Sequence, residues 1–228
     1  MTRSFRICPF PAASLVIISV ALTLPASEPD SLALRLQLKL DRVVAVKGRF
    51  VQRLDSASLG HPRSEKGRFF LKKPSMMRWE YEEPERKLAI TDGVVTWFYL
   101  PAEKEVHRGR VQGSEGTGAA SMLLSGGLRI DRDFTVRTLA ADDPDTAMAA
   151  GHAGVEVLEL LPRRGREEFD RVLLTVDPRE LQIRRFTLID ALGDRMIFEL
   201  HDLEENVDLA DELFRFAPPA GVEIIELR

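Results

Sequence analysis

Alternating hydrophobic and polar positions dominate the first half of the chain. In the stretch MMRWEYEE, residues 76–83, Met77, Trp79 and Tyr81 fall in one phase, and Arg78, Glu80 and Glu82 fill the other. Alternate side chains of a β-strand point to opposite faces, so the three large side chains share a face. The pattern leaves open whether that face is closed core or the wall of an apolar cavity.

The same period of two recurs, between turn residues, along most of the chain. It predicts about eleven short strands in an antiparallel meander. Asp92-Gly93 predicts a two-residue hairpin turn. Near the C-terminus, one helical turn is predicted in VDLADELFRF (207–216) and the last strand in VEIIEL (222–227). An antiparallel sheet of this size is expected to curl into a barrel or split into a sandwich.

The segment VVTWFYL, residues 94–100, is apolar in both phases, which predicts a strand covered on both sides. We expect Trp97 and Tyr99 to lie on the same inner face as Trp79. Methionine and aromatic side chains suit adaptable apolar surfaces, but this content fits a closed core as well as a ligand cavity.

Two helices are expected. SLALRLQLKLDRVV begins after Asp30 or Ser31, either of which can cap a helix at residues 32–46. Its inner stripe comprises Leu32, Leu36, Leu40, Val43 and Val44, with Leu34 and Leu38 on the other side. Such a helix must be covered on both sides or face a cavity.

A second, short apolar helix is predicted at residues 118–125. It carries Met122 and Leu123 and has glycines at both ends, which favours a movable segment. A plain surface helix with a glycine cap is the alternative.

The N-terminal 27 residues have the layout of a secretory signal peptide. Arg3 and Arg6 precede an apolar run from Ala12 to Leu24, and cleavage is expected near Ala26 or Ser27. The run is shorter than the roughly 20 residues that a membrane span needs, although an uncleaved anchor is the alternative. Residues 28–228 are expected to form a single domain.

Composition fits a soluble globular protein, with 44% hydrophobic and 30% charged residues. The formal net charge of -4 becomes -6 when the two arginines of the signal are removed. A mildly acidic protein has no general attraction for nucleic acid or anionic lipid head groups. The only cysteine is Cys8 in the signal, so the mature chain has no disulfide and no cysteine metal ligand.

No catalytic constellation is visible in the sequence. The four histidines are scattered without metal-binding spacing, the serines lack a nucleophile motif, and no phosphate-binding glycine loop precedes a helix. We therefore expect a protein that is not an enzyme and that needs neither metal nor cofactor. The histidines are His61, His107, His152 and His201.

Residues 72–101, KKPSMMRWEYEEPERKLAITDGVVTWFYLP, resemble the periplasmic outer-membrane lipoprotein carrier family, LolA. The similar features are Lys73-Pro74, Trp79, Pro84, Asp92-Gly93, and Trp97-Phe98-Tyr99 followed by Pro101. The resemblance extends to GRFVQ at 48–52, the glycine-flanked segment around Met122, and the end FRFAPPAGVEI.

The resemblance implies an unclosed antiparallel half-barrel whose concave face is covered by a helical lid over an apolar cavity. Carriers of this family take lipoproteins from an inner-membrane ABC transporter complex to an outer-membrane receptor. For this chain it implies a monomeric periplasmic carrier that shields lipoprotein acyl chains.

The resemblance also assigns residues to the site. In the family the position of Lys73 is typically arginine, which anchors the lid through hydrogen bonds to its backbone; lysine keeps the charge but loses the planar fork. The implied lid residues are Leu34, Leu38, Met122 and Leu123. The implied cavity-lining residues are Phe50, Phe70, Met77, Trp79, Tyr81, Trp97 and Tyr99.

Three other interpretations remain. The related outer-membrane receptor needs a lipidated cysteine at the cleavage site, and none is present there. A carrier of another acylated amphiphile, such as a glycolipid, is compatible with an apolar cavity. A sensor related to envelope-stress regulators would usually add a second domain, for which this chain has no room.

Overall fold

The computed structural model describes residues 31–56, 58, 60–110, 129–149, 154–164 and 169–227. The expected signal, residues 1–27, lies outside these ranges. The expected helix at 118–125, with Met122 and Leu123, lies outside them too, as does His152.

Strands make up most of the described chain. In chain order the elements are α1 (Leu32–Arg42), β1 (Ala45–Asp55), β2 (Arg63–Lys72), β3 (Met76–Glu83), β4 (Lys87–Thr91), β5 (Val95–Leu100), β6 (Glu105–Arg110), α3 (Ile130–Asp133), β7 (Phe134–Thr138), α4 (Pro144–Ala149), β8 (Glu156–Pro162), β9 (Arg171–Asp177), β10 (Gln182–Ile189), β11 (Arg195–Glu205), the 3-10 helix η2 (Asp211–Phe214) and β12 (Glu223–Glu226).

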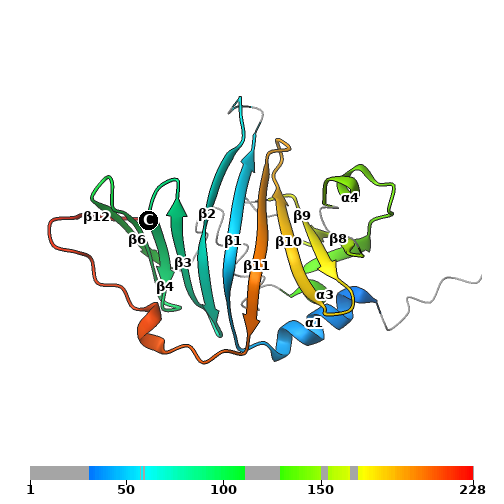
Figure 1. Cartoon of the computed structure of the whole chain (residues 1–228), viewed down its shortest axis with the longest axis horizontal. Coiled ribbons are helices and arrows are strands. Elements are labelled where there is room, and N and C mark those ends of the chain that lie inside the picture. The colour runs from blue at the N-terminus through cyan, green and yellow to red at the C-terminus, as the bar shows by residue number, and fades with distance from the viewer. Residues whose placement is uncertain are drawn as a thin grey trace, which may run out of the picture.

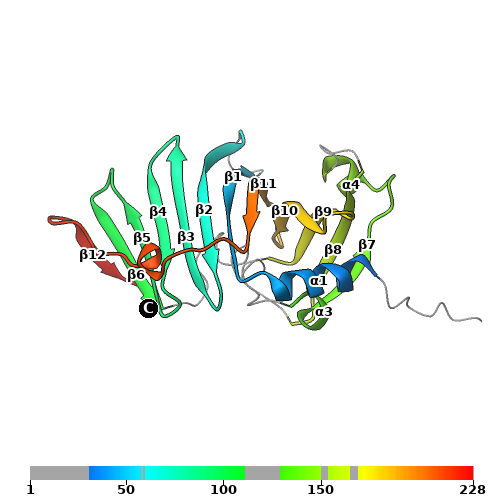
Figure 2. The ribbon, with the colours of Figure 1, turned by 60° about the horizontal axis from the view of Figure 1, so that its bottom comes forward.

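The twelve strands form one sheet in the order β12-β6-β5-β4-β3-β2-β1-β11-β10-β9-β8-β7 (Figure 1). The two ends of this order, β12 and β7, do not pair with each other, so the sheet is open. Figure 2 shows the sheet curling along its width, with α1 lying across one end. The expected mainly-β, unclosed fold is therefore confirmed, and the described ranges contain twelve strands where about eleven were expected.

The last strand corrects the expectation of a purely antiparallel sheet. β12 pairs with β6 in parallel, whereas the other neighbouring strands are antiparallel. The reason is the route of the chain. The C-terminal segment leaves β11 in the middle of the sheet and crosses to the far edge before it pairs, so it is not bound to β6 by a short hairpin.

The β4–β5 connection is longer than the expected two-residue hairpin. Thr91 pairs with Thr96, which leaves four residues between them. Within this turn the Asp92 carboxylate Oδ1 accepts hydrogen bonds from the backbone N–H groups of Val94 (2.9 Å) and Val95 (3.0 Å). These bonds favour the ionised carboxylate and hold the pKa of Asp92 below its ordinary value.

The sheet has an apolar inner face, on which α1 packs, and an outer face. Phe50 of β1 lies opposite Gly67 of β2, and Phe69 of β2 lies opposite Trp79 of β3, so these side chains alternate onto the inner face. They join the leucines of α1 in the main core. Charged pairs such as Arg68–Glu80 lie on the outer face of the same strands.

Gly67 permits a close approach of two strands. A Cβ atom built at this position would lie 1.9 Å from the carbonyl oxygen of Glu80, and the β2–β3 register shifts between Lys66 and Gly67. Only a residue without a side chain fits there. The register shift leaves Glu82 of β3 as an extra residue, and this bulge bends β3 and contributes to the curl of the sheet.

Residues 206–222, here called the C-terminal strap, cross the outer face of the sheet before β12 (Figure 2). The expected helical turn is present as η2, where Phe214 is buried against Ala45 and Leu209. Lys72 donates from Nζ to the Leu209 carbonyl (2.6 Å) and to the Asp211 carboxylate (2.6 Å). The strap therefore covers apolar side chains that the sheet presents on its outer face.

No helix within the described ranges is both long and apolar enough to cross a membrane.

Candidate functional site

A cluster of aromatic rings occupies the centre of the inner face. The ring of Phe50 lies 4.7 Å from Trp79, and Phe198 lies 5.6 Å from Trp79 and 4.5 Å from Phe186, measured between ring centroids. The rings come from β1, β3, β10 and β11. They join the two halves of the sheet into one apolar surface.

Four of the predicted lining residues lie together on this face. Phe50, Met77, Trp79 and Tyr81 are buried, with exposed fractions of 1%, 4%, 0% and 6%. The Tyr81 hydroxyl donates to Oε1 of Gln52 at 2.9 Å. Burial raises the pKa of Tyr81, so the phenol stays neutral.

The other three predicted lining residues lie on the outer face, which corrects the expectation. Phe70 pairs with Arg78, in the opposite phase to Trp79. Trp97 and Tyr99 pair with Ile90 and Leu88, whereas Ala89 is the residue that pairs with Trp79. Their rings instead contact Phe216 of the strap, with centroid distances of 5.8 and 5.6 Å.

For Trp97 and Tyr99 the error has a definite physical cause. Across β3 and β4, odd-numbered residues pair with odd-numbered ones; across the four-residue β4–β5 turn, odd pairs with even. Odd-numbered residues of β5 therefore lie on the opposite face of the sheet to odd-numbered residues of β3 and β4. Phe69 and Phe98 take the inner positions instead, since Phe98 pairs with Ala89. On β10 and β11, the alternating apolar residues Phe186 and Leu188, and Phe198 and Leu200, indicate in the sequence which side of these strands faces inward.

Helix α1 forms as predicted and packs on the inner face. Oγ of Ser31 accepts from the Leu34 backbone N–H (3.4 Å) at its start. Leu36 is fully buried, Leu34 is half-buried, and Leu38 is 51% exposed, so the second predicted lid position on this helix faces solvent.

The inner stripe ends earlier than expected. The helix stops at Arg42, not at residue 46, and Val44 beyond it is 58% exposed. Leu32, Leu36 and Leu40 therefore form the apolar contact of α1 with the sheet, together with Val43.

Lys73 lies where the C-terminal end of α1 meets the sheet. Its Nζ donates to the backbone carbonyl of Leu40 at 2.6 Å and to that of Asp41 at 3.3 Å. The last carbonyls of a helix lack partners within the helix and carry partial negative charge, so a cation is well placed there. Burial is the largest influence on this ammonium and lowers the pKa of Lys73.

Side chains around α3 hold the same end of the helix. Gln37, buried in α1, accepts from the Ile130 backbone N–H (2.7 Å) and donates to the Asp41 carboxylate (2.8 Å). Arg129 donates to that carboxylate from Nη1 at 3.1 Å. These contacts join α1 to the start of α3.

The middle of α1 is bound to the other side of the inner face. Lys39 Nζ lies 2.7 Å from Oε1 of Glu205 at the end of β11 and donates to the Glu180 carbonyl at 3.2 Å. Arg35 donates to the Pro178 carbonyl at 3.0 Å. Helix α1 is thus held to the sheet by polar groups on both sides of its leucine stripe.

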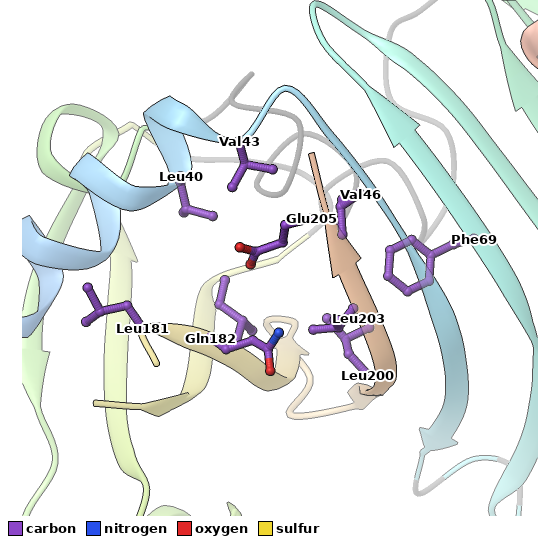
Figure 3. Close-up of a pocket in the computed structure, with 10 residues that line it drawn as sticks. Leu40, Val43, Val46, Phe69, Leu181, Gln182, Leu200, Leu203 and Glu205 are labelled. Atoms are coloured by element: carbon purple, nitrogen blue, oxygen red, sulfur yellow. The ribbon is translucent and has the colours of Figure 1, made fainter. Parts of the chain in front are cut away.

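A small pocket lies under the C-terminal half of α1 (Figure 3). Its cavity volume is about 30 Å³, which is room for about two water molecules. An acyl chain does not fit in it. Its lining residues are Leu40, Val43, Val46, Phe69, Leu181, Gln182, Ile183, Leu200, Leu203 and Glu205.

The described ranges contain no group of three or more His, Cys, Asp or Glu side chains placed to hold a metal ion. His107 and His201 each lie near one glutamate, Glu105 and Glu199.

Comparison with known proteins decides the family. The family model of the outer membrane lipoprotein carrier protein LolA matches residues 41–217. The chain belongs to the LolA family. An outer-membrane lipoprotein carrier protein of Methylococcus capsulatus is 29% identical over 84% of this chain and 86% of its own length. One of Nitrosomonas europaea is 26% identical over 92% and 96%.

A solved structure has a similar fold. It is an uncharacterised conserved protein from Thermus thermophilus, with a TM-score of 0.52, 12% identity, and coverage of 86% of this chain and 97% of that one. The family match and the lipoprotein carrier relatives support a LolA-type carrier role for this chain. The family description and the names of these relatives are those of carrier proteins.

Proposed function

We propose that this LolA-family protein shields the acyl chains of lipoproteins between α1 and the inner face of its sheet. In this way it moves lipoproteins from the inner membrane to the outer membrane. The observation that carries the proposal is the arrangement of α1. A row of leucines covers a broad aromatic and aliphatic surface, while a few polar side chains on both sides of that row hold the helix in place.

The energetics explain why a carrier is needed. Burying a methylene group is worth about 0.8 kcal/mol, so one chain of ~15 methylenes gains roughly 12 kcal/mol by leaving water. A lipoprotein cannot cross an aqueous compartment unless those chains are covered. The inner face, with Phe50, Trp79 and Phe198 at its centre, is a surface that can cover them.

In this proposal, the arrangement with α1 packed on the sheet is the closed form of the carrier. The cavity of about 30 Å³ is far too small for a chain, so loading requires α1 to move away from the sheet. The acyl chains then replace Leu32, Leu36 and Leu40 on the inner face. Apolar contact is exchanged and not lost, which allows both loading and release without a covalent step.

We also propose where the protein acts and with which partners. A signal at residues 1–27 is removed on export, and the mature chain acts as a monomer in the periplasm. It receives lipoproteins from an inner-membrane ABC complex and delivers them to an outer-membrane receptor. No cofactor or metal takes part.

Extraction of a lipoprotein tests the proposal directly. Residues 28–228 are mixed with inner-membrane vesicles that contain a triacylated lipoprotein, the ABC complex and ATP, and the soluble fraction is analysed for a complex. We expect an equimolar soluble complex. If the protein captured a free glycolipid but no lipoprotein, it would instead be a carrier of another acylated amphiphile.

Two positions on α1 give a matched pair for the same assay. Leu36→Asp should lower capture at least about tenfold, because a charged side chain would then face the acyl chains between α1 and the inner face. Leu38→Asp, on the exposed side, should leave capture unchanged. Circular dichroism checks that both variants are folded. Equal capture by the two variants would contradict the role of α1.

A further inference from the structure

Glu205 is the charged side chain among the residues that line the pocket. It is the last residue of β11 and lies opposite Val46 of β1, in phase with Leu203, so it belongs to the inner face. Its neighbour Glu204 lies opposite Lys47, in the other phase, and pairs with that lysine at 3.1 Å. A carboxylate therefore stands at the end of an otherwise apolar row.

The Glu205 carboxylate lies near Leu40 and Gln182 in Figure 3. About a quarter of the side chain is exposed (27%), which places it at the rim of the pocket and not in its depth. The lining residues on the other side of the pocket, such as Phe69 and Leu200, are almost fully buried. The pocket thus has an apolar interior and one polar end.

Lys39 neutralises this carboxylate while α1 is closed. The Nζ–Oε1 distance is 2.7 Å, and the lysine belongs to the helix, whereas the glutamate belongs to the sheet. Lys39 is the direct neighbour of Leu40, which forms one wall of the pocket. An acyl chain can enter only if Leu40 moves away, and Lys39 moves with it.

Opening therefore separates the two charges. Glu205 remains on β11, beside the surface that the acyl chain now occupies, and its ammonium partner is withdrawn. An unpaired carboxylate in a partly desolvated position repels another anion and accepts hydrogen bonds from N–H or O–H groups.

We propose that Glu205 selects cargo by the charge of its head group, which rests on the proposed carrier function. Acyl chains joined to an uncharged head with hydrogen-bond donors, such as the amide N–H of an acylated cysteine, are accepted. Chains joined to a phosphodiester are rejected, because the phosphate would lie beside the carboxylate. An apolar pocket distinguishes one chain from another poorly, so discrimination against phospholipid requires a repulsive element of this kind.

Competition binding on the mature protein tests the selection. The probes are a tripalmitoylated cysteinyl peptide without charged side chains and dioleoylphosphatidylglycerol, and the readout is the ratio of their dissociation constants. The wild type should prefer the lipopeptide. Glu205→Gln, which keeps the shape of the side chain, should reduce that preference at least about tenfold by tightening phosphatidylglycerol binding, and Glu205→Lys should reduce it further.

Glu204→Gln is the matched control, since it removes the same charge one residue away on the outer face. Its binding ratio should equal that of the wild type. A ratio for Glu205→Gln equal to that for Glu204→Gln overturns the selection while leaving the carrier function intact. A wild type that does not bind the lipopeptide at all overturns the carrier function itself.

Discussion

The Nζ atom of Lys73 lies 2.6 Å from the carbonyl oxygen of Leu40, so a side chain at the end of the sheet closes the C-terminal end of α1. Leu40 also contributes to the wall of the pocket below the helix. The same residue of α1 thus carries both the apolar contact and the polar bond that keep the helix on the inner face.

Replacing Lys73 by alanine should release α1. A hydrogen bond from a charged donor contributes about 1.5–3 kcal/mol, so opening of the helix should become at least about tenfold more frequent. Hydrogen exchange at the amides of α1 measures this directly, and Lys73→Arg should retain protection.

Lys72→Ala is the control for that experiment. Lys72 precedes Lys73 in the chain but binds Leu209 and Asp211 of the strap on the outer face. Protection of α1 should be unaffected by its removal. If the two alanine variants exchange alike, the bond from Lys73 is not what holds the helix.

The two tryptophans report on opposite faces of the sheet. Trp79 lies on the inner face and Trp97 on the outer face under Phe216. A lipopeptide with brominated acyl chains should quench Trp79, measured in Trp97→Phe, much more strongly than Trp97, measured in Trp79→Phe. Equal quenching of the two would show that the chains do not bind on the inner face.

Gly67→Ala should destabilise the protein strongly. The added Cβ would stand 1.9 Å from the Glu80 carbonyl oxygen, so the β2–β3 pairing must give way, at a cost of about 3 kcal/mol. Gly109→Ala is a milder control, since its Cβ would lie 3.3 Å from the Leu227 side chain. Urea unfolding gives both values, and equal midpoints would refute the close approach at Gly67.

Glu159 gives the protein an acid-sensitive contact on the outer face. Its side chain is buried, and the hydrogen bond from Arg137, followed by that from Arg171 (3.0 Å), lowers the pKa of Glu159. A carboxyl whose pKa is lowered on folding stabilises the protein above its unfolded pKa. That contribution is lost as the pH falls through the lower, folded value.

Glu159→Gln should therefore lower the free energy of unfolding by about 3 kcal/mol at pH 7, because the arginines lose their charged partner. For the same reason the stability of the variant should fall less steeply below pH ~4.5 than that of the wild type. Urea unfolding at several pH values measures the effect. Glu156→Gln, at an exposed position of the same strand, should keep the wild-type pH dependence. A Glu159→Gln profile parallel to the wild type would contradict this account.

Local patterns predicted the strands and the cap and inner stripe of α1 well, because alternation, helical spacing and capping depend on neighbouring residues. The face of a strand does not depend on neighbours alone. Trp97 and Tyr99 are odd-numbered like Trp79, but odd-numbered residues pair with even-numbered ones across the β4–β5 turn, so the two rings lie on the opposite face to Trp79.

The position of Lys73 beside α1 agrees with what the family resemblance implied. Local sequence could not have predicted it, because the Leu40 carbonyl that Lys73 binds is more than thirty residues away. The role of these bonds in moving a lid stays a prediction. Phe70, Trp97 and Tyr99 were misassigned for a related reason. Apolar outer positions require a cover, and nothing in the sequence near them shows that the strap supplies it.

The pairing of β1 with β11 divides the sheet into two local meanders, β1–β6 and β7–β11, that meet along a single seam. Within each meander, neighbouring strands are close in sequence, whereas β1 pairs with β11, which lies about 150 residues later in the chain. During synthesis, one edge of β1 therefore stays unpaired until β11 has been made. Phe50 and Phe198 meet across this seam, so the surface proposed to receive acyl chains is complete only after β11 has joined β1.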